Sequence, residues 1–402
     1  MRILDNLNLN QIYQYLLLIL AFLTPLTVFG ANFIVVIICV LWIFSGDYKS
    51  KYRLIIQSKF LIASILFFFL HVVGLLWTED LEWGLHITHK MWYFLLLLPV
   101  LYSIVQKKYI RKYITIFLLG VSVSEVTSYL IWFEIIPPFK YATVLNPTPF
   151  MSHISYNPIL AFAIYLLSHE LFFNKQLSKL KLIGYSFFAI TMSFNMFITG
   201  GRAGHVMYFV MISILIFQFF NFQKIKSIFA IVIIIPAIFF TAYQYSAFFH
   251  HRVDLAVKNV LNYNNDINSS VGLRITYTIN SWEVIKDNPI IGVGTGDYPG
   301  EYKKINSKNT PDQPKTTNPH NMYILVLTQL GLIGFVSFLS IFYYQIKESF
   351  YGAERYIRDI GVTLPVLYLI IMLSDSYLLG HYTTLMYVFF SSFLYRNFEK
   401  TE

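Results

Sequence analysis

The chain has 402 residues, of which 56% are hydrophobic, 18% are aromatic and only 13% are charged, with a mean hydropathy of +0.57. Soluble domains carry about 25% charged residues, so this composition excludes an ordinary soluble protein and predicts a polytopic membrane protein. The formal charge of +9 could indicate nucleic-acid binding, but its distribution among the loops explains it better. The single cysteine, Cys39, lies within an apolar run and excludes an internal disulfide.

Apolar runs long enough to form membrane-spanning helices recur along the whole chain. We expect about twelve, at roughly 11–29, 32–46, 59–77, 90–106, 113–133, 156–173, 181–199, 203–220, 227–247, 322–346, 359–378 and 381–396. No small-residue cleavage site follows the first run, so we expect an uncleaved first span. The predicted fold is an all-α polytopic membrane protein. Residues 1–246 form the first nine spans, 247–319 a large outer loop with short helices, and 320–402 the last three spans.

Basic residues alternate between the loops on the two sides of these spans. One set of loops holds the basic clusters 49–53, 107–112, 175–181, 224–226 and 347–358. The opposite set begins with the acidic segment Glu79-Asp80-Leu81-Glu82, and Lys90 and Lys140 are its isolated exceptions among the short loops. Short cytoplasmic loops attract Lys and Arg, so both termini are predicted in the cytoplasm and the large loop outside.

Three arginines, Arg202, Arg252 and Arg274, fall on the predicted outer side, where this charge rule does not explain them. Arginine suits phosphate because its planar fork gives paired, charge-assisted hydrogen bonds and stays charged. Arg202 lies in a tight turn, Thr199-Gly200-Gly201-Arg202-Ala203-Gly204, and Arg274 begins a helical pattern in the large loop. We interpret these two as functional. Arg252 follows His250-His251 and is interpreted as a solvated surface arginine.

The large loop contains a predicted amphipathic helix that ends at Asn288-Pro289. Its apolar residues recur at helical spacing: Val271, Ile275, Ile279, Trp282 and Ile285. That stripe could lie on the bilayer surface or on the bundle. The next segment, Pro289-Ile290-Ile291-Gly292-Val293-Gly294-Thr295-Gly296-Asp297, has three alternating glycines whose amides could cradle phosphate. No strand–turn–helix unit surrounds it, so a structural turn is the preferred interpretation.

The sequence Pro319-His320-Asn321 ends the loop, and an apolar run follows it. His320 would therefore lie at a helix N-terminus, at the edge of the membrane. Gly331 and Gly334 would share one face of that helix, where small residues let another helix approach. A polar cap above packing glycines is the simplest interpretation of this pattern.

The pattern His-Asn, nine residues, Gly-x-x-Gly resembles the signature of the bacterial O-antigen ligase family, within the O-antigen ligase/polymerase superfamily. In that family it lies at the end of a large periplasmic loop. Arg202 matches the family's arginine in a Gly-rich outer turn. Arg274 matches its loop arginine, upstream of Trp282 and of the stretch Pro289–Gly294. The resemblance covers about residues 195–345 by motif, and the rest of the chain by topology only.

The resemblance implies glycosyl transfer on the periplasmic face of the inner membrane, in lipopolysaccharide biosynthesis. The donor would be a glycan on undecaprenyl diphosphate, and the acceptor the sugar core on lipid A. Arg202 and Arg274 would stabilise the diphosphate leaving group, and His320 would accept the proton of the acceptor hydroxyl. Asn321 and Trp282 would help to bind substrate. No Asp-x-Asp pair is present, so neither a metal nor another cofactor is expected.

Three alternatives remain open. A polymerase of the same superfamily would join repeat units on the carrier, and a protein-directed oligosaccharyltransferase would usually have an extra carboxy-terminal region. A non-enzymatic transporter of lipid-linked glycan would need ionisable residues across many spans. Here most charge lies in loops, which favours an enzyme. Of the other polar residues, His205 and His381 are interpreted as structural. His153 receives no assigned role, and neither does Asp375, which is predicted inside a span.

Overall fold

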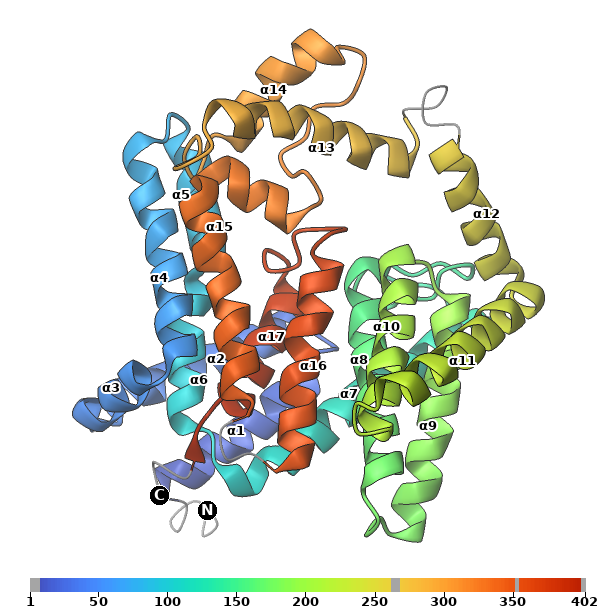
Figure 1. Ribbon diagram of the computed structural model, residues 1–402. Helices are drawn as coiled ribbons and strands as arrows, with labels where there is room; N and C mark the ends of the chain where they lie inside the picture. Colours follow the sequence, from blue (N-terminus) through green and yellow to red (C-terminus); the bar gives the residue numbers. More distant parts are fainter. Residues whose placement is uncertain (1–7, 262–267, 351–353, 399–402) are drawn as a thin grey trace. The chain divides into compact units, whose positions relative to one another are not determined.

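The structure is a computed structural model that describes residues 8–261, 268–350 and 354–398. In those ranges the regular secondary structure is helical, apart from an isolated bridge between Thr143 and Asn146 (Figure 1). The chain forms two compact units. Unit 1 consists of Met1–Ile37 and Lys108–Leu255, and unit 2 of Ile38–Lys107 and Ala256–Glu402.

Unit 1 is built around one helix that is buried over most of its length. Its helices are α1 (Leu9–Leu23), α7 (Ile110–Trp132), α8 (His153–Phe173), α9 (Lys179–Ile198), α10 (Arg202–Phe219) and α11 (Lys224–Tyr245). Helix α8 is buried continuously from Tyr156 to Glu170 and packs against α9 and α10, while α1 packs against α7. In contrast, α11 is only 11% buried over its apolar window, as expected for a helix that faces lipid.

Unit 2 contains mostly shorter helices, with the exception of the 27-residue α15. These are α3 (Tyr48–Gln57), α4 (Lys59–Val73), η1 (Gly74–Trp77), α5 (Leu81–Lys90), the π-helix η2 (Tyr93–Leu97), α6 (Leu98–Ile104), η3 (Lys107–Tyr109), α13 (Ser270–Asp287), α14 (Tyr298–Asn309), α15 (Met322–Glu348), α16 (Arg355–Ile371) and α17 (His381–Leu394). Three helices contain a boundary between the units: α2 (Val28–Phe44), η3 and α12 (Ala247–Leu261). Helix α15 packs along α4 and α16, and α17 along α6.

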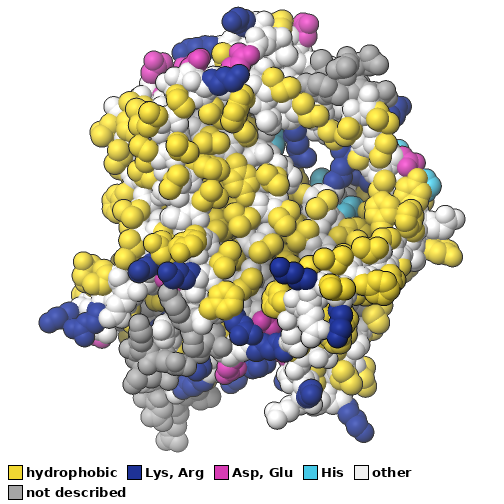
Figure 2. All heavy atoms as spheres, viewed as in Figure 1, with side chains coloured by type: hydrophobic (Ala, Val, Ile, Leu, Met, Phe, Trp, Pro, Cys, Tyr) yellow, Lys and Arg dark blue, Asp and Glu magenta, His cyan; other side chains and the backbone are white. Residues whose placement is uncertain are grey.

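Each apolar run predicted above contains a helix. Among the described residues, seven helical segments are long and apolar enough to cross a membrane, and the bent pair α2 and α3 would make an eighth. Figure 2 shows hydrophobic side chains over most of the α4 and α15 surface of unit 2. The chain is therefore an all-helical, multi-pass membrane protein. The count of twelve spans and the side of the large loop stay predictions.

Helix α15 changes direction part-way along its length (Figure 1). The break lies at Gly331, which has φ 58° and ψ −158°. The backbone groups that the break releases are taken up by residues 289–294. Leu332 N donates to Pro289 O at 2.8 Å and Ile333 N to Ile290 O at 3.2 Å, while Thr328 O and Gln329 O accept from the amides of Val293 and Gly294 at 2.9 and 3.0 Å. The glycine-rich stretch of the loop thus completes the hydrogen bonding of the broken helix. The packing-glycine interpretation of Gly331 was incomplete for this reason.

The glycine-rich stretch is a structural turn. From Gly292 to Asp297 every backbone amide donates a hydrogen bond within the protein, so none is left to cradle a phosphate. A Cβ on Gly292 would lie 2.4 Å from the carbonyl carbon of Gln329, and one on Gly331 would lie 2.3 Å from that of Ile290. The two glycines are therefore needed where loop and helix meet.

The expected amphipathic helix is α13, which ends at Asp287 with Asn288 as its C-cap, as predicted. Its buried residues face α14: Thr276, Tyr277, Asn280 and Ser281 are buried, and Asn280 donates to Thr310 Oγ1 at 2.8 Å. The apolar stripe partly faces outward, with Ile279 52% exposed. Helix α13 thus makes polar contacts to α14 and its C-cap Thr310, and it also packs against α15.

Candidate functional site

His320 is fixed by contacts to the loop that follows α16. Its amide donates to Asn318 Oδ1 at 2.9 Å, and the same oxygen accepts from Ser376 Oγ at 2.9 Å. His320 has a φ of 52°, a left-handed conformation that is uncommon for a non-glycine residue. Such strain persists only where the surroundings determine the conformation, and it concentrates at functional sites.

Asn321 is the N-cap of α15. Its Oδ1 accepts from the amides of Tyr323 and Ile324 at 3.0 and 3.2 Å, and its Nδ2 donates to Leu373 O at 3.3 Å. Met322 N donates to Met372 O at 2.9 Å. The first amides of α15 are therefore satisfied, which makes Asn321 an anchor for the histidine beside it.

Asp375 is the partner of the His320 side chain. His320 Nδ1 lies 3.2 Å from Asp375 Oδ1, and the two side chains are 37% and 15% exposed. A carboxylate accepts hydrogen bonds, so we assign the proton to Nδ1, which leaves Nε2 with a lone pair. Asp375 had been predicted inside a span, but α16 ends at Ile371. The apolar run continues past the helix end because Leu373, Leu378 and neighbouring residues of the loop are hydrophobic.

The Asp375 carboxyl is held in its charged form. Burial opposes its ionisation, but the hydrogen bond and charge of His320, the amide of Ser376 and the charge of Arg274 together outweigh burial. These interactions hold the pKa of Asp375 below its ordinary value. At neutral pH a charged acceptor is thus available to keep the His320 imidazole in one orientation.

Arg274 lies on α13, close enough to Asp375 for its charge to act on that carboxyl. In the described chain the Arg274 side chain makes no hydrogen bond or ion pair, and it is partly exposed. One turn further along α13, the Tyr277 ring stacks over the His320 imidazole, with centroids 6.1 Å apart and an interplanar angle of 25°. Unit 2 therefore brings together Arg274, His320 and Asp375. The guanidinium is available to a ligand.

Trp282 is not joined to this group by any hydrogen bond or ring contact among the described residues. Its side chain lies on α13 and is 48% exposed. A substrate role for Trp282 stays a prediction, as it does for Asn321.

Arg202 is the first residue of α10 in unit 1, directly after the predicted glycine turn. Gly201, its N-cap, has φ 131°, and a Cβ on Gly204 would lie 2.0 Å from the Asn157 Cβ. Asn146 supports the turn from the preceding loop, because its Oδ1 accepts from Gly200 N at 2.7 Å. The glycines thus let α10 start against α8 with Arg202 at its end.

His153 and His205 lie at this end of unit 1. Asn146 Nδ2 lies 3.2 Å from His153 Nδ1. The buried His205 places Nε2 2.9 Å from Met196 O and 3.2 Å from Thr199 O, which supports the structural interpretation of that residue.

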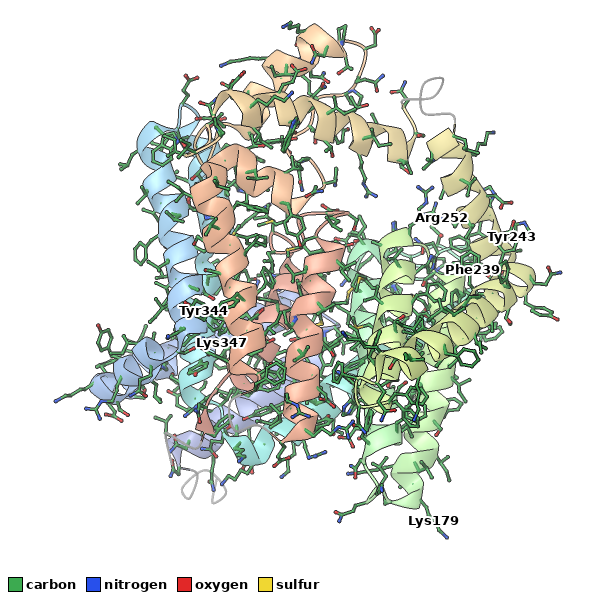
Figure 3. The ribbon with its side chains drawn as sticks, viewed as in Figure 1. Lys179, Phe239, Tyr243, Arg252, Tyr344 and Lys347 are labelled. Carbon is green, nitrogen blue, oxygen red and sulfur yellow. The ribbon has the colours of Figure 1, made fainter. Side chains whose placement is uncertain are left out.

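Arg252 is more than a solvated surface residue. Its guanidinium lies over the Phe248 ring at 5.8 Å, its charge and that of His153 act on the buried His205, and its Nε is buried without a hydrogen-bond partner in the described chain. Figure 3 shows Arg252 at the same end of unit 1 as Tyr243 and Phe239, with Lys179 at the opposite end. The sequence did not predict these interactions of Arg252, because the polar segment His250-His251-Arg252 is typical of an exposed surface.

An apolar cavity of about 800 Å³ lies in unit 1 between α9, α10 and the α11–α12 junction. Its lining includes Trp132, Phe194, Phe197, Ile238, Tyr245 and Phe248. Phe248, which lines the cavity, also carries the Arg252 guanidinium over its ring. An apolar chain with an anionic head would match this combination.

The chain is similar to a known protein family and to a protein of similar length. A family model described as O-antigen ligase matches residues 187–339, a segment that includes Arg202, Arg274 and His320. An uncharacterised protein of Haemophilus influenzae is 28% identical over 388 residues, covering 90% of this chain and 92% of that protein. The predicted resemblance is confirmed for residues 187–339, which match the O-antigen ligase family.

Proposed function

We propose that this protein is an O-antigen ligase. It would transfer a glycan from undecaprenyl diphosphate to the sugar core of lipid A, on the periplasmic face of the bacterial inner membrane. The observation that carries the proposal is the His320–Asp375 pair beside the unpaired Arg274, within a segment that matches the family. Family membership alone supports glycosyltransferase-like chemistry, and the donor and acceptor are part of the proposal.

The residues of unit 2 support proton removal from an acceptor hydroxyl. With Nδ1 hydrogen-bonded to Asp375, Nε2 of His320 takes the proton as the hydroxyl oxygen attacks the anomeric carbon of the donor. The bond from that carbon to the diphosphate oxygen breaks, and the diphosphate leaves with the bonding electrons. Asp375 stabilises the imidazolium that forms, and a direct displacement of this kind inverts the anomeric centre.

The arginines support stabilisation of the leaving group. Negative charge accumulates on the diphosphate as the bond breaks, and fixed cations lower the energy of that state. Arg274 supplies a guanidinium in unit 2, and Arg202 and Arg252 supply two more in unit 1. The apolar cavity beside Arg252 has the lining that a prenyl chain needs.

The purified full-length protein should be assayed with a lipid-diphosphate glycan and lipid A–core. Glycan on lipid A–core is the expected result. Longer glycan on the carrier would instead identify a polymerase, and no transfer to either would favour a transporter.

The His320→Ala variant ties the assay to this site. A general base contributes about 10²–10⁴-fold to rate, so the variant should lose transfer by that factor while it still binds donor. Donor binding rests on the arginines. A folded His320→Ala protein that ligates at the wild-type rate would refute the catalytic role.

A further inference from the structure

Glu125 is a buried carboxyl group in the membrane-spanning helix α7. It is 1% exposed, and both of its side-chain oxygens are buried without a hydrogen-bond partner among the described residues. Two other buried glutamates differ from it. Glu170 pairs with Arg111 at 2.8 Å, and Glu348 accepts from Ser58 Oγ at 3.0 Å. Glu125 therefore lacks the partners that hold the other carboxylates.

The polar groups beside Glu125 are engaged elsewhere. Thr191 of α9 lies next to the carboxyl, but its hydroxyl donates to Phe187 O at 3.0 Å. Tyr129 of α7 donates to Thr191 O at 2.7 Å, and Tyr156 of α8 donates to Asn195 at 2.8 Å. These two tyrosines are the ionisable groups on which a Glu125 charge would act, and no described cation offsets that charge.

Among the described residues, an ionised Glu125 would thus be a buried charge without a counter-ion, beside a threonine hydroxyl that already donates to a carbonyl. Such a charge is costly inside a membrane helix, where a carboxyl avoids the cost by binding a proton. We propose that Glu125 is an intramembrane proton-binding site, occupied at neutral pH. This proposal does not depend on glycosyl transfer.

A polar layer connects the neighbourhood of Glu125 with the Arg202 turn. Asn195 Nδ2 donates to Ser128 Oγ at 3.0 Å on α7. One turn further along α9, Thr199 Oγ1 donates to Asn195 O at 3.0 Å and to Asn157 Oδ1 at 3.1 Å. Thr199 directly precedes Gly200 of the turn. Glu125 therefore lies beside a hydrogen-bonded layer inside unit 1, one turn of α7 before its Ser128.

Carbodiimide labelling tests the site. Dicyclohexylcarbodiimide is apolar and reacts with protonated carboxyl groups. The proton goes to a carbodiimide nitrogen, and the carboxyl oxygen bonds to the central carbon. The adduct rearranges to a stable N-acylurea, with no leaving group. Membranes that contain the full-length protein should be treated at neutral pH, and peptides identified by mass spectrometry. We expect an adduct on Glu125 and none on the ion-paired Glu170. Absence of the Glu125 adduct would count against the proposal.

Infrared spectroscopy gives a second test that does not depend on access by the reagent. Glutamine is neutral and close in shape to a protonated glutamate, so Glu125→Gln should fold and keep the wild-type melting temperature. The wild-type spectrum should contain one protonated carboxylic-acid C=O band that Glu125→Gln lacks. Glu170→Gln is the matched control and should remove a carboxylate band. Loss of a carboxylate band in Glu125→Gln would overturn the proposal.

Discussion

The imidazole Nδ1 of His320 lies 3.2 Å from Oδ1 of Asp375, across 55 positions of sequence. This contact sets which ring nitrogen can act as a base. It also joins the start of α15 to the loop after α16, so one hydrogen bond both orients the proposed catalytic residue and fixes the loop that supports it.

Asp375→Asn should reduce transfer strongly while donor binding is kept. An amide can donate to Nδ1 and favour the opposite tautomer, in which Nε2 carries the proton and cannot accept another. We expect a loss of about 10²-fold or more in the rate of transfer, within the usual contribution of a general base. The measurement is the rate with saturating donor, together with donor affinity. Asp312→Asn, an exposed position in the segment between α14 and α15, is the control. A rate within about twofold of wild type would remove Asp375 from the mechanism.

The lowered pKa of Asp375 predicts how stability depends on pH. The contribution of its ionised form is fully present above about pH 4, the ordinary value for Asp, and is lost as the pH falls through the lower pKa of the folded protein. Wild type should therefore melt at a higher temperature than Asp375→Asn near neutral pH, and the difference should shrink below about pH 4. Thermal unfolding in detergent over a pH series measures it. A difference that grew in acid would contradict the assignment.

Arg274→Lys and Arg202→Lys should each impair transfer although the charge is kept. Lysine loses the planar fork that binds two phosphate oxygens at once. A hydrogen bond to a charged group is worth about 1.5–3 kcal/mol, so each variant should lose roughly tenfold or more in kcat/KM. Arg53→Lys, at an exposed position in α3, is the control for insertion and folding. Wild-type transfer by both variants would return these arginines to ordinary surface charge.

Gly331→Ala should destabilise the protein without touching a proposed catalytic group. The new Cβ would meet the backbone of Ile290 at 2.3 Å, at a positive φ and extended ψ that cost alanine about 1–3 kcal/mol before any clash. We expect a lower melting temperature and a lower yield of folded protein. Gly300→Ala is the matched control because its Cβ would meet no atom within 4 Å and it lies within α14, where alanine favours helix. Equal melting temperatures for the two variants would show that the break tolerates a side chain.

Reporter fusions test the predicted topology. A fusion at Asn309, at the end of α14, should be active only with a periplasmic reporter, and one at Lys179 only with a cytoplasmic reporter. The basis is the alternation of basic loops along the chain. A cytoplasmic result at Asn309 would contradict both the orientation and the proposed mechanism.

The sequence predicted local features well because they depend on nearby residues. Apolar runs located the helices, helical spacing located α13, and a polar dipeptide before an apolar run located the cap at Asn321. Features that join distant segments were not predicted. Asp375 was placed inside a span because hydrophobic residues continue past the end of α16. The break at Gly331 was hidden inside an apolar run, since nothing in that run shows that residues 289–294 satisfy its backbone.

The repair of α15 by residues 289–294 has a consequence for exchanging parts between related proteins. The two segments hydrogen-bond to each other through their backbones, although residues 295–327 separate them in the sequence. A chimera with residues 289–294 from one relative and α15 from another would pair two segments whose sequences are not matched to each other. Residues 289–294 and 328–333 should therefore be exchanged together, even when the aim is to alter only one of the two segments.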